Sequence, residues 1–131
     1  MKFIIVLLLC FSVASCAARP KSEMILSADY GPYPDNYEQI IKDHYSTKLF
    51  DPYSAVYTFN TQPRRDYDRV SSGVQFGWVV CGTINGKNRF GGYVGVQPFY
   101  ALIKNGHVIV AYEEFMANAA CQAIHGPDTL Q

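Results

Sequence analysis

The amino-acid sequence predicts an α+β fold, in which an N-terminal and a C-terminal helix pack on an antiparallel meander sheet of about four strands. Three observations support this class. Apolar residues recur at helical spacing over residues 35–49, the period changes to two from Ala55 onward, and Asn105-Gly106 separates two apolar runs. The chain has 131 residues, which is enough for one domain and too few for two.

The first helix is predicted from Asp35 to Leu49. Asp35 can cap it, and Glu38, three residues later, completes a capping-box pattern. The helix should end before Pro52, because a proline disfavours helical backbone at the residue before it. His44 lies on the apolar side, so we interpret it as a partly buried, hydrogen-bonded side chain rather than a ligand. The full stripe consists of Tyr37, Ile40, Ile41, His44, Tyr45 and Leu49.

Strands are predicted from the change of period. Residues 55–59 alternate as a short strand, whereas residues 60–72 are polar, contain Pro63 and are expected to form a loop. A longer strand follows, and its two faces alternate strictly. One face is expected to carry Val74, Phe76, Trp78, Val80 and Ile84, with Gln75, Gly77, Val79, Cys81 and Thr83 opposite.

A hairpin and a final helix complete the predicted domain. Residues 93–104 and 107–112 form the hairpin, because Asn105-Gly106 supplies the two residues with positive φ that a type I′ turn requires. Residues 113–124 are expected to be helical, since they are rich in alanine and begin with two glutamates at the positive end of the helix dipole.

The N-terminus has the features of an export signal. Lys2 precedes the uninterrupted apolar run Phe3–Phe11, which is about half of the roughly 20 residues that a membrane-spanning helix needs. Val13-Ala14-Ser15-Cys16 resembles the lipobox of bacterial lipoproteins. The resemblance implies cleavage before Cys16, acylation of this residue and stable anchoring in a lipid membrane. The alternative is an ordinary secretory signal that is cut one or two residues later.

This interpretation divides the chain into four parts. They are a lipoprotein signal peptide at 1–15, the acylated Cys16 with a tether at 16–34, the α+β domain at 35–126 and a C-terminal tail at 127–131. Within the tether, Met24, Ile25 and Leu26 have the alternative of docking on the domain. Ala17 follows the acylated cysteine, which resembles export to the outer membrane, so we expect the domain to face the periplasm.

The same signal sorts the four cysteines. Cys10 leaves with the signal peptide and Cys16 is acylated, so Cys81 and Cys121 remain as an even pair. In an oxidising compartment the default interpretation of such a pair is a disulfide. The alternative is a catalytic thiol, which would need a depressed pKa and an access route.

Composition and motifs argue against several classes of function. The eleven basic and eleven acidic residues balance, and no dense basic run is present, so we expect no nucleic-acid partner. The segment Gly82–Asn88 superficially resembles the phosphate-binding Walker loop. However, it has three residues between its glycines where the Walker pattern needs four, and Asn88 follows Lys87 where that pattern needs Ser or Thr. We therefore expect no nucleotide. The three histidines lack metal-ligand spacing, so neither a metal nor another cofactor is expected.

Catalytic motifs are also missing from the sequence. No GxSxG elbow occurs. Glu113 and Glu114 are adjacent, so on a helix they point about 100° apart and are unsuited to flank a substrate together. We therefore expect a protein that is not an enzyme, and a hydrolase is the third hypothesis after two binding functions.

The stretch 77–100 (GWVVCGTINGKNRFGGYVGVQPFY) resembles a pattern of small uncharacterised bacterial proteins. The pattern is Val-Cys-Gly, then Asn-x-Lys-Asn, then Gly-Gly-Tyr-x-Gly-x-x-Pro-Phe. The resemblance implies a shared fold and supports the disulfide, but it implies no activity. The matching residues are Val80–Gly82, Asn85, Lys87-Asn88, Gly91–Tyr93, Gly95 and Pro98-Phe99.

The loop in this stretch is the candidate recognition surface, formed by Lys87, Asn88, Arg89 and Tyr93, because tyrosine and arginine are favoured at the centres of interfaces. The other interpretation, which the turn glycines favour, is a structural role, with glycines that bend a hairpin and Lys87 and Asn88 as solvated turn residues. The sequence thus indicates a periplasm-facing binding or envelope-associated module, whose partner is an envelope protein or a glycan. The alternative function is an inhibitor or immunity protein against an envelope hydrolase.

Overall fold

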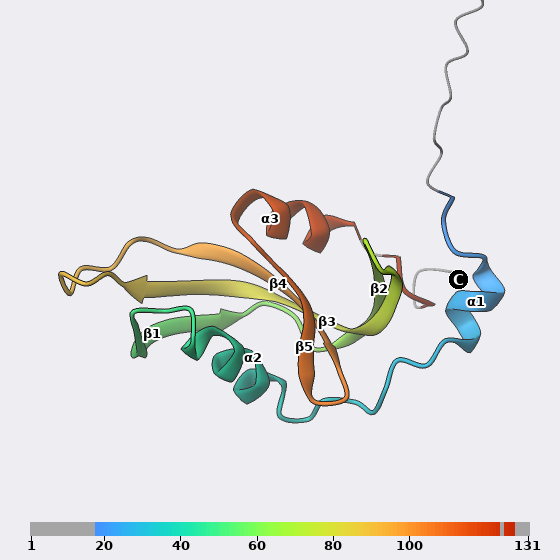
Figure 1. Cartoon of the computed structure of the whole chain (residues 1–131), viewed down its shortest axis with the longest axis horizontal. Coiled ribbons are helices and arrows are strands. Elements are labelled where there is room, and N and C mark those ends of the chain that lie inside the picture. The colour runs from blue at the N-terminus through green and yellow to red at the C-terminus, as the bar shows by residue number, and fades with distance from the viewer. Residues whose placement is uncertain (1–17, 124, 128–131) are drawn as a thin grey trace, which may run out of the picture.

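The computed structural model describes residues 18–123 and 125–127, so the predicted signal peptide and Cys16 lie outside the described residues. The predicted α+β class is confirmed, and the described residues form a five-stranded antiparallel sheet and three helices (Figure 1). No helix in this part of the chain is long and apolar enough to cross a membrane. The elements are α1 (Ser22–Ser27), α2 (Tyr37–Ser46), β1 (Asp51–Phe59), β2 (Arg64–Val70), β3 (Gly73–Lys87), β4 (Gln97–Lys104), β5 (His107–Glu113) and α3 (Glu114–Gln122).

The long strand β3 is the centre of the sheet. The strand order is β1-β3-β4-β5, and β2 also pairs with β3. The second half of β3 pairs with β1, from Gly82 to Lys87, and its first half pairs with β2, from Gly73 to Val79. Strands β1 and β2 therefore lie end to end along one side of β3, while β4 and β5 continue the meander on the other side.

Strand β2 corrects the prediction of a loop over residues 60–72. Seven consecutive residues, Arg64 to Val70, pair with β3 although most of them are polar. An edge strand forms through main-chain hydrogen bonds to its neighbour, so it does not require apolar side chains. Pro63 lies just before the paired segment, where its missing N–H removes no hydrogen bond from the sheet. With β2 included, the described part of the sheet has five strands instead of the four that were expected.

Helices cover both faces of the sheet, with α3 above it and α2 below it in the view of Figure 1. Consecutive β3 residues therefore both reach a core, and Val79 and Val80 are fully buried on opposite faces. The two faces of β3 follow the predicted alternation. The core on the α2 side contains Ile40, Ile41, Tyr45, Val80, Ile84, Phe99, Ala101 and Ile103, and the core on the α3 side contains Val79, Cys81, Tyr100, Leu102, Val110 and Ala117.

A β-bulge at Ile109 lets β5 serve both cores. Ile103 pairs with Val108 and Leu102 pairs with Val110, so Ile109 has no opposite residue. Residues two apart in a regular strand share a face. Here the extra residue turns the strand, so Val108 packs on the α2 side and Val110 on the α3 side.

Helix and strand ends differ from the predictions at several places. Helix α2 begins at Tyr37 rather than Asp35, and its N-cap residue Asn36 makes no side-chain capping bond. Glu38 instead pairs with Lys42 at 3.7 Å, one turn along the helix, so the expected capping box is absent. Strand β4 begins at residue 97 instead of 93, because the preceding glycine-rich segment leaves the sheet.

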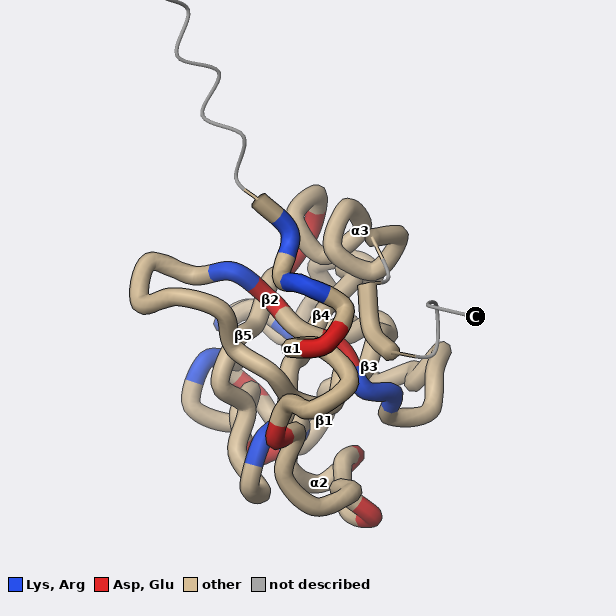
Figure 2. Tube along the Cα trace, turned by 90° about the vertical axis from the view of Figure 1, so that its right-hand side faces the viewer, with Lys and Arg blue, Asp and Glu red and all other residues tan. Residues whose placement is uncertain are grey.

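The segment before α2 is packed against the domain, so the described domain extends upstream of its expected start at residue 35. Ile25 of α1 and Tyr30 are only 4% and 6% exposed. The Trp78 indole N–H donates to the Gly31 carbonyl at 3.0 Å, and Lys104 donates to the Asp29 carbonyl at 2.7 Å. This end of the molecule carries interspersed basic and acidic residues (Figure 2).

Candidate functional site

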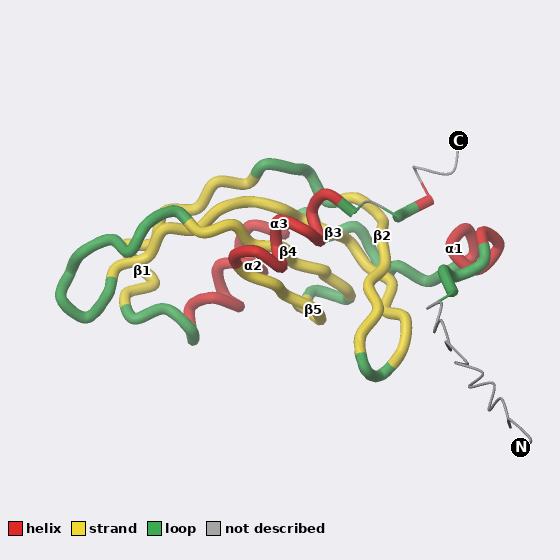
Figure 3. Tube along the Cα trace, turned by 90° about the horizontal axis from the view of Figure 1, so that it is seen from above, coloured by secondary structure: helices red, strands yellow, loops and turns green. Residues whose placement is uncertain are grey.

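The predicted recognition loop belongs to a projecting connection between β3 and β4, which we call the arm (residues 88–96). Figures 1 and 3 both show the arm at the end of the molecule opposite α1. Main-chain contacts hold its base together, since Val94 N–H donates to Gly86 O at 3.1 Å and Lys87 forms an isolated β-bridge with Tyr93. The arm is therefore an ordered extension of the sheet.

Asn88 organises the tip of the arm. Its side-chain oxygen accepts the N–H groups of Phe90 at 2.9 Å and Gly92 at 3.2 Å. Its main chain also bonds twice within the tip, donating to Gly92 O at 2.9 Å and accepting from Gly91 N at 3.0 Å. Gly91 has φ +80°, a conformation that favours glycine. The Asn88 side chain, expected at a recognition surface, thus shapes the loop itself.

The other predicted recognition residues lie around the base of the tip. The Lys87 ammonium is 5.1 Å from the centroid of the Tyr93 ring, and the Tyr93 hydroxyl donates to the Ser54 carbonyl at 2.9 Å. Arg89 is exposed. The structure therefore brings all four residues together, but it gives Asn88 and Tyr93 structural contacts within the chain.

Sequence reasoning missed the apolar side chains at this end. Phe90 at the tip is 89% exposed and Tyr53 in the neighbouring part of β1 is fully exposed. Because residues 93–104 were predicted as one strand, Val94 and Val96 were expected in the sheet. We call seven of the thirteen exposed large apolar residues in the described part of the chain the apolar end; they are Phe50, Tyr53, Val56, Phe90, Tyr93, Val94 and Val96.

Strand β1 carries a wide bulge next to the arm. Asp51 pairs with Lys87 and Val56 pairs with Asn85, so four residues of β1 stand opposite one residue of β3. Ser54 fixes the bulge, since its N–H reaches the Asp51 carboxylate and its hydroxyl reaches the Asp51 carbonyl, both at 3.3 Å. Bulges of this kind redirect side chains. A groove of about 520 Å³ lies between this part of β1 and α2.

A smaller cleft of about 190 Å³ lies where α2 meets the end of β5. The Lys48 ammonium is 3.6 Å from the Glu113 carboxylate at its rim. Burial raises the pKa of Tyr45, and the neighbouring Glu113 carboxylate raises it further. Burial is the main cause that lowers the pKa of His44, and the charge of Lys48 lowers it further. Among the described residues His44 Nε2 is buried without a hydrogen-bond partner, although a hydrogen-bonded histidine was expected.

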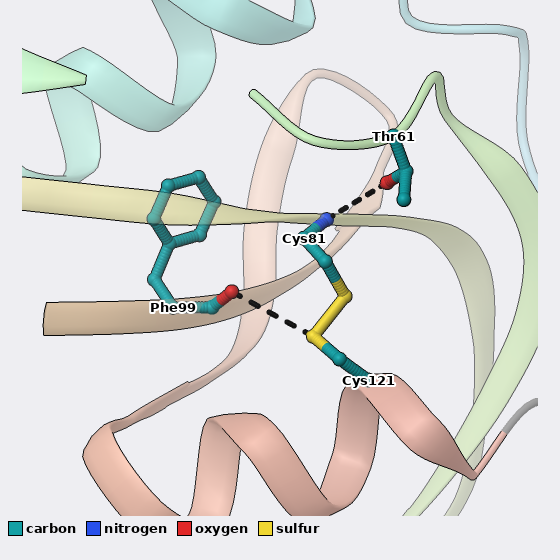
Figure 4. The surroundings of a disulfide bond; sticks show 4 residues. All are labelled: Thr61, Cys81, Phe99 and Cys121. Carbon is teal, nitrogen blue, oxygen red and sulfur yellow. Dashed lines mark hydrogen bonds between the residues drawn. A yellow bond between two sulfur atoms is a disulfide. The ribbon is translucent and has the colours of Figure 1, made fainter. Parts of the chain in front are cut away.

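The predicted cysteine pair lies at disulfide distance, and the bond joins β3 to α3 (Figure 4). The Cys81 and Cys121 Cα atoms are 6.1 Å apart. The Cys81 N–H donates to the Thr61 hydroxyl at 3.0 Å, which ties the β1–β2 connection to the same place. Both sulfurs are used in the bond, so neither residue offers a free thiol in this structure.

Asp66 in β2 is a buried carboxylate with a structural role. It is 2% exposed and accepts the N–H groups of Tyr67 at 2.8 Å and of His125 at 3.2 Å. Burial raises its pKa, and the two main-chain donors work in the opposite direction. Asp66 therefore fastens the segment that follows α3 to the sheet.

Neither a metal site nor a known relative assigns a function to these surfaces. No group of three or more His, Cys, Asp or Glu side chains within residues 18–123 and 125–127 is placed to hold a metal ion. Comparison of the chain with protein families, with curated proteins and with solved structures gives no match.

Proposed function

We propose that the protein is a lipid-anchored binding module of the bacterial envelope, facing the periplasm from the outer membrane, and that the arm recognises an envelope protein. The observation that carries the proposal is the apolar end, where an ordered loop exposes an aromatic ring at its tip. Exposed apolar side chains that gather at one end of a folded protein are typical of interaction sites, and aromatic residues are enriched at interface centres.

The position of the arm suits a protein held at its N-terminus. Arg69, in β2, donates a hydrogen bond to the Ala18 carbonyl, so the first described residue lies near β2 and α1. The arm is at the opposite end (Figures 1 and 3). A chain acylated at Cys16 would therefore present the tip of the arm away from the bilayer that holds it.

The arm is tested by site-specific photocrosslinking in intact cells. A benzophenone side chain at position 90 of the full-length protein should give a discrete crosslinked protein. The matched control places the same group at Phe115, which is similarly exposed but lies on α3. A product at both positions, or at neither, would refute recognition by the arm. Phe90→Ala should release the same partner from a native complex.

The anchor is tested separately at Cys16. Cys16→Ala should abolish palmitate labelling and leave unprocessed precursor, because acylation precedes cleavage in lipoprotein maturation. Normal labelling of this variant would contradict the anchor.

An inhibitor or immunity protein against an envelope hydrolase is the second candidate, and the narrow tip built around Asn88 favours it. A preorganised loop enters a cleft with little loss of conformational entropy. If the crosslinked partner is a hydrolase, the wild-type protein should abolish its turnover at a one-to-one ratio, and Phe90→Ala should restore it. A hydrolase activity of this chain is the third hypothesis, and no arrangement of described residues favours it.

A further inference from the structure

We infer that the groove between α2 and β1 binds a neutral oligosaccharide. Its volume of about 520 Å³ lies within the range of small-molecule sites, about 300–1,000 Å³. This inference goes beyond the proposed function, because it concerns a surface beside the arm and a ligand of another class. The residues that carry it are Gln39, Lys42, Asp43 and Ser46 of α2 and Tyr53 and Tyr57 of β1.

One wall of the groove is aromatic. Tyr53 and Tyr57 both line it, and Tyr53 is fully exposed because the β1 bulge turns it out of the sheet. The bulge is held in place by the Tyr93 hydroxyl on the Ser54 carbonyl. The exposed Tyr53 ring offers a flat face against which the C–H groups of a pyranose ring can pack, and the partly buried Tyr57 ring lines the same wall. Both hydroxyls can bond to a ligand.

The opposite wall is polar. Gln39, Asp43 and Ser46 follow the i, i+4, i+7 spacing of one helix face. The Gln39 amide donates to one Asp43 carboxylate oxygen at 2.6 Å. A side-chain amide has two N–H groups and an oxygen, so this pair still has donor and acceptor capacity for a ligand. Adjacent sugar hydroxyls both donate and accept, and they match such an amide–carboxylate pair.

The charges of the groove favour a neutral saccharide over a polyanion. Among the described residues that line the groove, Lys42 and Asp43 carry the charges, and these are of opposite sign. The Lys42 ammonium is also 3.7 Å from Glu38 and 5.7 Å from the centroid of the Phe59 ring. Burial raises the pKa of Tyr57, so its hydroxyl stays protonated and able to donate.

Saturation-transfer difference NMR tests the inference on the full-length protein in a zwitterionic detergent that contains no sugar. The probes are triacetylchitotriose, cellotriose and maltotriose, each at about 5 mM, a concentration at which even millimolar affinity is detected. Saturation should reach the ring C–H protons of at least one probe. Tyr53→Ala should weaken that binding by about tenfold or more, which corresponds to 1.4 kcal/mol. Gln39→Ala should weaken it in the same direction.

Two control variants distinguish this groove from other surfaces. Phe115→Ala removes an exposed ring from α3 and should leave saccharide binding unchanged. Phe90→Ala should also leave it unchanged while abolishing capture of the protein partner, so failure of one proposal is visible without failure of the other. Absence of transfer to all three probes, or equal transfer in wild type and Tyr53→Ala, would overturn the inference.

Discussion

The Tyr93 hydroxyl donates a 2.9 Å hydrogen bond to the main-chain oxygen of Ser54, 39 residues away in the sequence. The contact closes the arm onto β1 and, at the same time, fixes the bulge that turns Tyr53 outward. The Tyr93 side chain therefore stabilises both the arm and the β1 bulge that lines the groove.

Removing this hydroxyl should loosen the bulge without unfolding the protein. Tyr93→Phe should lower the free energy of unfolding by about 1 kcal/mol, the usual net value of such a bond, and should speed amide exchange at residues 53–56. Urea denaturation and hydrogen exchange measure the two effects. Tyr53→Phe removes the hydroxyl of a fully exposed ring and should change neither; equal effects from both variants would contradict the assigned role of Tyr93.

Gly82 occupies a place in β3 where a side chain does not fit. A Cβ there would overlap the Thr58 carbonyl oxygen and lie 2.7 Å from the Phe99 ring. We expect Gly82→Ala to cost roughly 3 kcal/mol or more in urea denaturation, as overpacking against a main-chain atom leaves little room to relax. Gly92→Ala is the control, because its nearest neighbour would be 3.8 Å away. A stable Gly82→Ala protein would refute the close packing of β1 on β3.

The disulfide closes a loop with a sequence separation of 40. In the chain-entropy model such a bond contributes about 4 kcal/mol to the free energy of unfolding. A reducing agent should therefore lower the urea midpoint of the wild-type protein. The urea midpoint of a Cys81→Ala, Cys121→Ala double variant should be the same with and without the reducing agent. Thiol alkylation of the native wild-type domain should require prior reduction, and reaction without it would contradict the pairing.

His44 should make stability depend on pH. Burial and Lys48 hold the pKa of His44 below its ordinary value of 6.5, and Glu113 opposes them. The folded state therefore binds fewer protons than the unfolded state, so this contribution to stability is complete well above pH 6.5 and is lost as the pH falls through the lowered pKa. Urea midpoints between about pH 8 and about pH 5 should fall less in His44→Gln than in wild type. Parallel curves for the two proteins would exclude His44 as the cause.

The parts of the fold with strong local signals were predictable. The type I′ turn at Asn105 and Gly106 has positive φ at both residues, 51° and 79°, because this dipeptide adopts that conformation at little cost. The alternation along β3 was also predictable, since its side chains must alternate whatever lies above them. Strand β2 was not predictable, because its polar residues show no strand pattern and are extended only because they pair with β3.

The candidate site was predictable only as a location. Glycines and charged residues in the loop indicated a surface feature, and Lys87, Asn88, Arg89 and Tyr93 do lie together. The exposure of Phe90 depends on the tip leaving the sheet, which a periodic apolar pattern does not reveal. The groove depends on how α2 packs across β1, and such tertiary placement has no local signal.

The last described residues protect an edge of the sheet. Asp66 and Tyr67 point to opposite faces of β2, and His125 contacts both, through a hydrogen bond and a ring contact of 5.5 Å. His125 therefore runs beside the strand, and Gly126 lies against the Arg65 main chain. An open edge strand is a template for pairing between molecules. Residues 125 and 126 form no strand, yet they occupy part of the β2 edge at which a second molecule would have to pair.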